Sequence, residues 1–107
     1  MATEIWGIPS CDSCRKARKA LPEASFRDIR TQALSGDEIA ELLTAFGDKL
    51  INRASATWRG LDEERRAMLP AELLSAHPTL MKRPVIRHAG KLHLGFTPAV
   101  RAALGLA

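Results

Sequence analysis

The sequence predicts an α/β fold in which four strands form one small mixed sheet. Three observations lead to this prediction. A strand pattern, a helix pattern and a second strand pattern follow one another within the first 29 residues, which is typical of a βαβ unit with parallel strands. Residues from about 35 to 82 then form a mainly helical segment. Two alternating runs around Ala89-Gly90 predict a hairpin, and a last helix follows it.

Length and composition favour a single domain over residues 1–107, with the helical insert at about 35–82. A chain of 107 residues can bury one core. Hydrophobic residues make up 46% and charged residues 26%, as in ordinary globular proteins, and no apolar run approaches the ~18 residues of a membrane span. The N-terminal residues enter a strand without the pattern of a secretory signal, and the two cysteines suggest no disulfide framework. We therefore expect a monomeric, cytoplasmic protein.

The net charge of +4 does not by itself indicate a nucleic-acid or membrane partner. The basic residues are dispersed along the chain, and aromatic residues make up only 5% of it. A solvated surface with a small anion-binding pocket accounts for the charge, so we expect neither partner.

The elements before the insert can be placed from local signals. The run from Thr3 to Ile8 is β-branched and aromatic and predicts a strand. A helix follows to about Leu21, where Pro22 ends it. The alternating run 25–29 predicts the second strand.

The insert should begin with a helix that has a capping box formed by Ser35 and Glu38. Gly47 is expected to end this helix in a left-handed conformation. Residues 52–59 are polar and without period, so we interpret them as an ordered loop. The face expected to be buried on the first helix consists of Ile39, Leu42, Leu43 and Phe46. Two further short helices are expected, at 61–68 and 70–76.

Strand patterns return after the insert. Residues 83–88 and 91–96 should form the two strands of the hairpin. Thr97 and Pro98 then begin the last helix, and Gly105 ends it.

Both cysteines lie where the first strand pattern ends and the first helix pattern begins, in Cys11-Asp12-Ser13-Cys14. The first N–H groups of a helix carry partial positive charge, so a Cys11 thiolate is stabilised there and the pKa of Cys11 should be low. Cys14 is one turn further on, in a stripe with Ala17, and should face inward. We therefore expect Cys11 to attack and Cys14 to resolve. This motif after a strand is typical of thioredoxin-like redox proteins.

Two other interpretations of the cysteine pair stay open. The pair could be half of a zinc site completed by His77, His88 or His93, although the sequence has no second paired-ligand motif and we expect no metal. Alternatively, both thiols could be buried core residues without chemistry.

Three separated segments also carry a family resemblance. They are Pro9–Arg18 with both cysteines, Asn52-Arg53 with Thr57-Trp58-Arg59, and His77–Val85. In this order they resemble the arsenate reductase-like family (ArsC), which includes the Spx regulators and the YffB-type proteins. The resemblance extends from Ile5 to about Leu104 and implies a thioredoxin-like fold with a helical insert.

The matching positions imply roles for individual residues. Cys11 matches the nucleophile of the family, Arg53 and Arg83 match two arginines of its anion pocket, and Pro84 matches a cis-proline that faces the cysteine. Arg15, beside the cysteine pair, is a further candidate for anion binding. Guanidinium groups suit these roles because they hold oxyanions bidentately and lower the pKa of a nearby thiol.

Two departures from the family pattern bear on the activity. The glutaredoxin-coupled arsenate reductases usually have one cysteine in this loop and a third arginine after the final hairpin, where this chain has Leu94-Gly95-Phe96-Thr97. Arg101 is too far along to match that arginine. Spx chains continue with a longer charged tail. The shorter length, the Thr57-Trp58-Arg59 segment and the position of Phe96 look most like the YffB branch.

These observations predict a thiol-disulfide oxidoreductase that binds no cofactor and uses glutathione as co-substrate. Its substrate would be a small thiol compound or an oxyanion. One alternative is an arsenate reductase that receives electrons from glutaredoxin. A second alternative is an Spx-like redox-sensing regulator that binds RNA polymerase.

Overall fold

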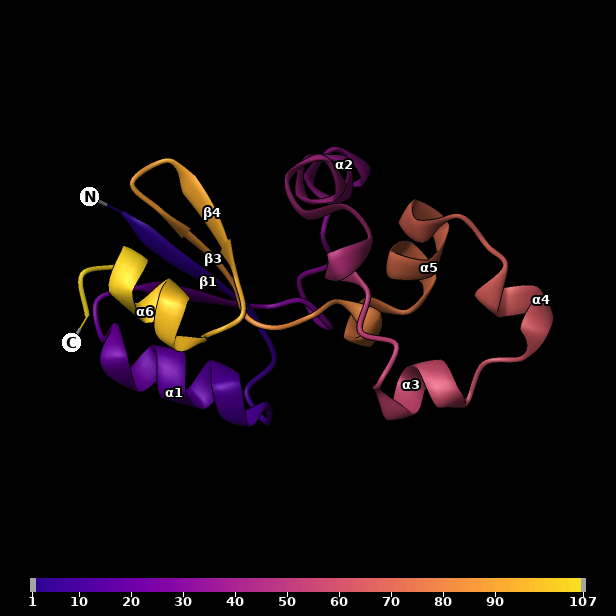
Figure 1. Ribbon diagram of the computed structural model, residues 1–107, viewed down its shortest axis with the longest axis horizontal. Helices are drawn as coiled ribbons and strands as arrows, with labels where there is room; N and C mark the ends of the chain where they lie inside the picture. Colours follow the sequence, from indigo (N-terminus) through magenta and orange to yellow (C-terminus); the bar gives the residue numbers. More distant parts are fainter. Residues whose placement is uncertain (1, 107) are drawn as a thin grey trace. The chain divides into compact units, whose positions relative to one another are not determined.

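A computed structural model describes residues 2–106 (Figure 1). Its element order confirms the predicted succession of βαβ, helices and ββα. The elements are β1 (Thr3–Gly7), α1 (Asp12–Ala20), β2 (Ser25–Asp28), α2 (Gly36–Phe46), the 3-10 turn η1 (Gly47–Leu50), α3 (Ala56–Arg59), α4 (Glu63–Arg66), α5 (Pro70–Ala76), the 3-10 turn η2 (Pro78–Leu80), β3 (Val85–His88), β4 (Lys91–Leu94) and α6 (Pro98–Ala103).

The four strands form one mixed sheet in the order β2-β1-β3-β4. β1 is parallel to β2 and antiparallel to β3, and β3 pairs antiparallel with β4. Ile5 at the centre of β1 is opposite Phe26 on one side and Ile86 on the other. The predicted α/β class with a four-stranded mixed sheet is confirmed.

The chain forms two compact units. The first, which we call the sheet unit, contains the described residues up to Ile29 and those from Arg83 onward. The second, the helical unit, is Arg30–Lys82. The helical insert that we expected at about 35–82 lies within the range of the helical unit.

In the sheet unit, α1 and α6 lie side by side over one face of the sheet (Figure 1). The core beneath them is formed by Ile5, Ala17, Ile86 and Leu104, and Val100 of α6 packs against it. α1 has Asp12 in its first turn and basic residues in its last turn, which matches the direction of the helix dipole. The buried residues of α1, Cys14 and Ala17, lie on the side of the helix that faces the sheet, and its basic residues are exposed.

In the helical unit, the predicted capping box is present at the start of α2. The Ser35 N–H donates to Glu38 at 2.8 Å, and the Glu38 N–H donates to the Ser35 hydroxyl at 3.1 Å. Gly47 follows α2 with a φ of 60° and a ψ of −141°, so it has the expected positive φ but not the ψ of a left-handed helical cap. Of the four residues expected on the buried face, Ile39 and Leu42 are buried, whereas Leu43 and Phe46 are half-buried.

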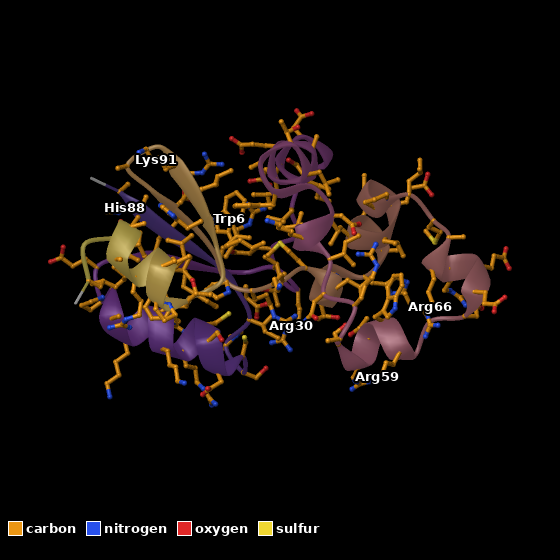
Figure 2. All side chains as sticks on the ribbon, in the orientation of Figure 1. Trp6, Arg30, Arg59, Arg66, His88 and Lys91 are labelled. Carbon is orange, nitrogen blue, oxygen red and sulfur yellow. The ribbon has the colours of Figure 1, made fainter. Side chains whose placement is uncertain are left out.

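The interpretation of residues 52–59 as a loop was wrong in its second half, where α3 forms. The Ser55 hydroxyl caps this helix by accepting from the Trp58 N–H at 3.1 Å. We missed this cap because a single helical turn has no apolar period. The Arg66 guanidinium, which Figure 2 labels, ties α4 to α3 by donating to the carbonyl oxygens of Trp58 and Arg59 at 3.2–3.3 Å.

Three elements are also shorter than predicted. β3 begins at Val85 and not at residue 83, since Arg83 and Pro84 precede the strand. α4 covers only Glu63–Arg66, because Asp62 caps it by accepting from the Arg65 N–H at 2.9 Å. β4 ends at Leu94, because Gly95 adopts a φ of 80° that a strand residue does not have. Within residues 2–106, no helix has the length and apolar character needed to cross a membrane.

Candidate functional site

The site lies at the turn between β1 and α1. The Cys11 N–H donates to the Ile8 carbonyl at 3.2 Å and closes a tight turn through Pro9 and Ser10. Cys11 is the N-cap residue of α1, with extended backbone angles, and its carbonyl accepts the first helical hydrogen bond, from Arg15, at 2.9 Å. The Cys11 side chain is therefore located where the N–H groups of the first helical turn have no partner within the helix.

The pKa of the Cys11 thiol is lowered from its ordinary value. Partial burial acts in the opposite direction, but hydrogen bonds from the Cys14 N–H, the Cys14 thiol and the Arg83 guanidinium outweigh it, and the charge of Arg83 adds to them. Each of these groups stabilises the thiolate. Cys11 is partly exposed, so the nucleophile that forms is accessible.

Cys14 has the opposite character. Its side chain is 0% exposed, as the helical stripe predicted. Burial raises the pKa of Cys14 to about 12, and the neighbouring Cys11 thiolate also disfavours a second negative charge. The pair therefore consists of a Cys11 that ionises more readily than an ordinary thiol and a Cys14 that stays protonated at neutral pH and donates to it.

Gly7, the last residue of β1, makes room for the Cys14 thiol. A methyl group at Gly7 would overlap the Cys14 Sγ and approach the Cys14 Cβ to 3.4 Å. Sequence reasoning missed this residue. The available signal was a glycine inside a strand pattern, which often marks a close approach to the backbone.

Arg83 and Pro84 bring the start of β3 to the same turn. The peptide bond between them is cis, as the resemblance implied. Pro84 is fully buried, and its carbonyl accepts from the Gly95 N–H at 2.7 Å, which extends the pairing of β3 and β4 by one step. The structure thus brings Arg83 to Cys11 from a position 72 residues further along the chain.

Arg53 and Arg15 are placed differently. Arg53 belongs to the helical unit, where its guanidinium donates twice to Asp48 at 2.8 Å and lies 5.1 Å from the centre of the Trp58 ring. Arg15 is exposed on α1 and lies 3.6 Å from Asp12. Anion binding by Arg53 and Arg15 stays a prediction.

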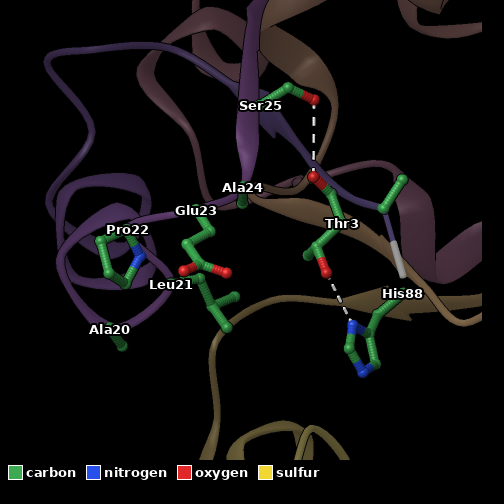
Figure 3. A pocket seen from close by; sticks show the side chains of 9 residues that line it. Thr3, Ala20, Leu21, Pro22, Glu23, Ala24, Ser25 and His88 are labelled. Atoms are coloured by element: carbon green, nitrogen blue, oxygen red, sulfur yellow. Dashed lines mark hydrogen bonds between the residues drawn. The ribbon is translucent and has the colours of Figure 1, made fainter.

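The described residues contain no group of three His, Cys, Asp or Glu side chains arranged to hold a metal ion. A pocket of about 470 Å³ at the far end of α1 contains neither cysteine (Figure 3). In it, Thr3 Oγ1 and His88 Nδ1 are hydrogen-bonded at 2.7 Å, and the Ser25 hydroxyl donates to the Thr3 carbonyl at 3.4 Å. Since this pocket contains no thiol, we assign no part of the chemistry to it.

Comparisons with known proteins agree with this fold. The ArsC family model matches residues 6–104. The structure of the YffB protein is 32% identical, with a TM-score of 0.86 over 95% of this chain and 97% of that one. An arsenate reductase-related protein from Brucella melitensis is 34% identical, with a TM-score of 0.74 over 99% of this chain and 97% of that one.

A third relative is the global transcriptional regulator Spx of Listeria innocua. It is 38% identical over 103 residues, which cover 86% of this chain and 78% of that protein. The resemblance inferred from the sequence motifs is thereby confirmed, together with the thioredoxin-like fold of arsenate reductase-like thiol oxidoreductases. The chain belongs to the ArsC family.

Proposed function

We propose that this protein is a glutathione-dependent thiol-disulfide oxidoreductase that reduces mixed disulfides. The observation that carries the proposal is the opposite ionisation of two adjacent thiols. Cys11 is partly exposed and has a lowered pKa, whereas Cys14 is buried and has a raised pKa. A pair that served only to fill the core would have no reason to stabilise one thiolate at a helix N-terminus.

The reaction proceeds by two thiol-disulfide exchanges. The Cys11 thiolate attacks the glutathione sulfur of a mixed disulfide, a new bond forms between Cys11 and glutathione, and the substrate leaves as a thiolate that takes up a proton. The thiolate of a second glutathione then attacks this bond and leaves as oxidised glutathione, which regenerates the Cys11 thiolate. In sum, one mixed disulfide and one glutathione yield one thiol and one oxidised glutathione.

The residues around Cys11 have separate tasks in this scheme. The Arg83 guanidinium stabilises the Cys11 thiolate and can hold a glutathione carboxylate, because it carries several donors in a planar fork. Cys14 donates to Cys11 and can release a bound glutathione by forming the Cys11–Cys14 disulfide. Arg53 and Arg15 are proposed as further contacts to the anionic groups of the substrate.

Arsenate reduction is less well supported. The family's third arginine would follow the hairpin, and residues 94–97 contain no cation. The nearby Arg101 belongs to α6, and its guanidinium lies 5.0 Å from the centre of the Phe96 ring. An oxyanion site would therefore lack one of its three expected charge-assisted contacts.

The similarity to Spx favours a second candidate, a redox-sensing regulator. In that case a Cys11–Cys14 disulfide would act as a switch that controls binding to RNA polymerase, and no substrate would be turned over. The two candidates differ in one measurable property, which is catalytic turnover of a disulfide.

The experiment compares the wild type with C11S and C14S variants. Reduced protein is incubated with a small glutathione mixed disulfide, glutathione, and glutathione reductase with NADPH, while intact mass spectrometry follows the adducts. We expect turnover by the wild type, a stable glutathione adduct on Cys11 in C14S when free glutathione is withheld, and no adduct on C11S. A Cys11–Cys14 disulfide without turnover would favour the regulator. Thiol oxidation that depends on added arsenate would favour the arsenate reductase.

A further inference from the structure

We propose that the groove between α1 and α6 binds an extended, acidic segment of a protein substrate and so selects which mixed disulfides reach Cys11. This inference rests on the proposed function and names its substrate class. It concerns only the sheet unit, in which α1, α6 and the cysteine turn all lie.

The groove has a cationic rim and an apolar floor. Its volume is about 450 Å³. Ala20 of α1 lines it together with Phe96 and Pro98 from the start of α6. The cations that line it are Lys16, Lys19 and Arg101. Such a lining suits a ligand with carboxylates and at least one apolar side chain.

The cations are available for an anionic ligand to different degrees. Lys19 is exposed and forms no ion pair with a described residue. Lys16 is 3.3 Å from Asp12, but its side chain is 69% exposed, so this pair is weak. Arg101 stacks over Phe96 at 5.0 Å, which fixes its guanidinium at the edge of the apolar floor.

The distribution of charge between the two units also supports an acidic partner. The residues of the sheet unit include nine Lys and Arg and four Asp and Glu, whereas those of the helical unit include seven and eight. The sheet unit therefore carries all of the excess positive charge. Such a field attracts acidic surfaces and increases their rate of encounter.

The groove also has a suitable distance from the nucleophile. With a rise of about 1.5 Å per residue, the backbone of Lys16 lies about 7.5 Å and that of Lys19 about 12 Å further along the helix axis than Cys11. An extended peptide advances about 3.3 Å per residue. A substrate whose cysteine lies at Cys11 would thus place its second to fourth neighbouring residues at these lysines.

The position of the groove also agrees with the order of the exchange steps. In the scheme proposed above, Cys11 attacks the glutathione sulfur, so the peptide leaves as its thiol in the first exchange. In this scheme Arg83 binds the glutathione part of the mixed disulfide, and the groove binds the peptide whose thiol leaves. The two anionic parts of the substrate therefore have separate cationic partners.

The experiment uses three synthetic peptides that each carry one cysteine as a glutathione mixed disulfide. The first has a leucine next to the cysteine and three glutamates at the second to fourth positions on either side. The second has glutamines in place of the glutamates, and the third has lysines. The measured quantity is the ratio of kcat/KM for the acidic peptide to that for the glutamine peptide. We expect a ratio of roughly ten for the wild type, since each exposed pair contributes about two- to fivefold. It should approach one at about 0.5 M salt.

Variants locate the preference on the groove. K16A/K19A should reduce the ratio to about two, and R101Q should reduce it by a smaller factor. The matched control is K91Q, which removes an exposed cation of the hairpin at the start of β4. This variant should keep the ratio of the wild type.

The possible failures can be told apart. If the wild type reduces all three peptides at equal rates, the docking inference is wrong and the proposed function stands. If it reduces none of them, the proposed function is wrong. The groove is then tested by fluorescence anisotropy with labelled acidic and glutamine peptides that carry serine in place of cysteine, and equal binding overturns the inference. Displacement of the acidic peptide by a short oligonucleotide at lower concentration than by unlabelled peptide would also overturn it, in favour of nucleic acid.

Discussion

The two faces of helix α1 differ in burial and in charge, although the whole helix has only nine residues. On the inner face, Cys14 and Ala17 are both 0% exposed and lie against the sheet. On the outer face, Arg15, Lys16 and Lys19 are exposed and basic. The inner face buries the Cys14 thiol and so raises its pKa, and the outer face would present charge to the partner that we propose. On this proposal, one short helix separates reactivity from recognition, and each should respond to different substitutions.

The largest effect should be the difference in alkylation between Cys11 and Cys14. Iodoacetamide reacts with thiolates, and the pKa of Cys14 is raised to about 12 whereas that of Cys11 is lowered. At neutral pH we expect Cys11 to react at least roughly tenfold faster than Cys14 in the native protein, because Cys11 is both more ionised and more accessible. The Cys11 rate should rise with pH and level off above its lowered pKa. Peptide mapping by mass spectrometry after timed quenching measures both rates, and faster labelling of Cys14 would reverse the assignment of roles.

The next largest effect is expected from R83A. Loss of the guanidinium removes a hydrogen bond and a positive charge from the Cys11 thiolate, so the pKa of Cys11 should rise. Alkylation at a fixed neutral pH should slow and recover at higher pH. Binding of glutathione should weaken roughly ten- to hundredfold, since a charge-assisted hydrogen bond contributes about 1.5–3 kcal/mol. Isothermal titration with glutathione and circular dichroism would separate this effect from a loss of folding.

R53A provides the comparison for R83A. If Arg53 also holds the anionic substrate, glutathione binding should weaken to a similar degree while the alkylation profile of Cys11 changes less. If Arg53 serves only its ion pair with Asp48, affinity for glutathione should equal that of the wild type. Unchanged affinity in both variants would contradict the anion pocket.

A smaller effect, on stability, should follow from G7A. The added methyl group would overlap the Cys14 Sγ, so the inner face of α1 must shift. Overpacking of this kind costs about 1–3 kcal/mol of the free energy of unfolding. The matched control is G36A at the start of α2, where an added methyl group meets nothing within 4 Å and should be neutral or slightly stabilising. Urea denaturation of both variants tests this contrast, and equal midpoints would mean that Gly7 makes no room for Cys14.

The smallest effect should come from the outer face, with K16A. Lys16 and Asp12 are both mostly exposed, and alanine suits a helix interior. The free energy of unfolding should therefore change by less than about 0.5 kcal/mol. Denaturation under the conditions used for G7A gives the comparison, and a change as large as that of G7A would show that the two faces are not distinct in stability.

Much of the fold follows from signals that act over a few residues. The cap at Ser35, the glycine at Gly47 and the proline that begins α5 each satisfy backbone groups within one turn of a helix, so the sequence displays them directly. The cysteine turn belongs to the same class. Its spacing already indicates which thiol is at the helix N-terminus and which is one turn further on, and the structure has the same arrangement.

Long-range packing decided the remaining features. α3 is one turn long and has no apolar period, so only its formation in the helical unit reveals the cap at Ser55. The close approach of Cys14 to Gly7 depends on how α1 packs against β1. The contact of Arg83 with Cys11 depends on the pairing of β1 with β3. The groove between α1 and α6 joins residues about 80 positions apart. Local hydrogen bonds and periodicity determined the elements of this protein, whereas the sharing of one sheet face by distant helices determined which side chains meet.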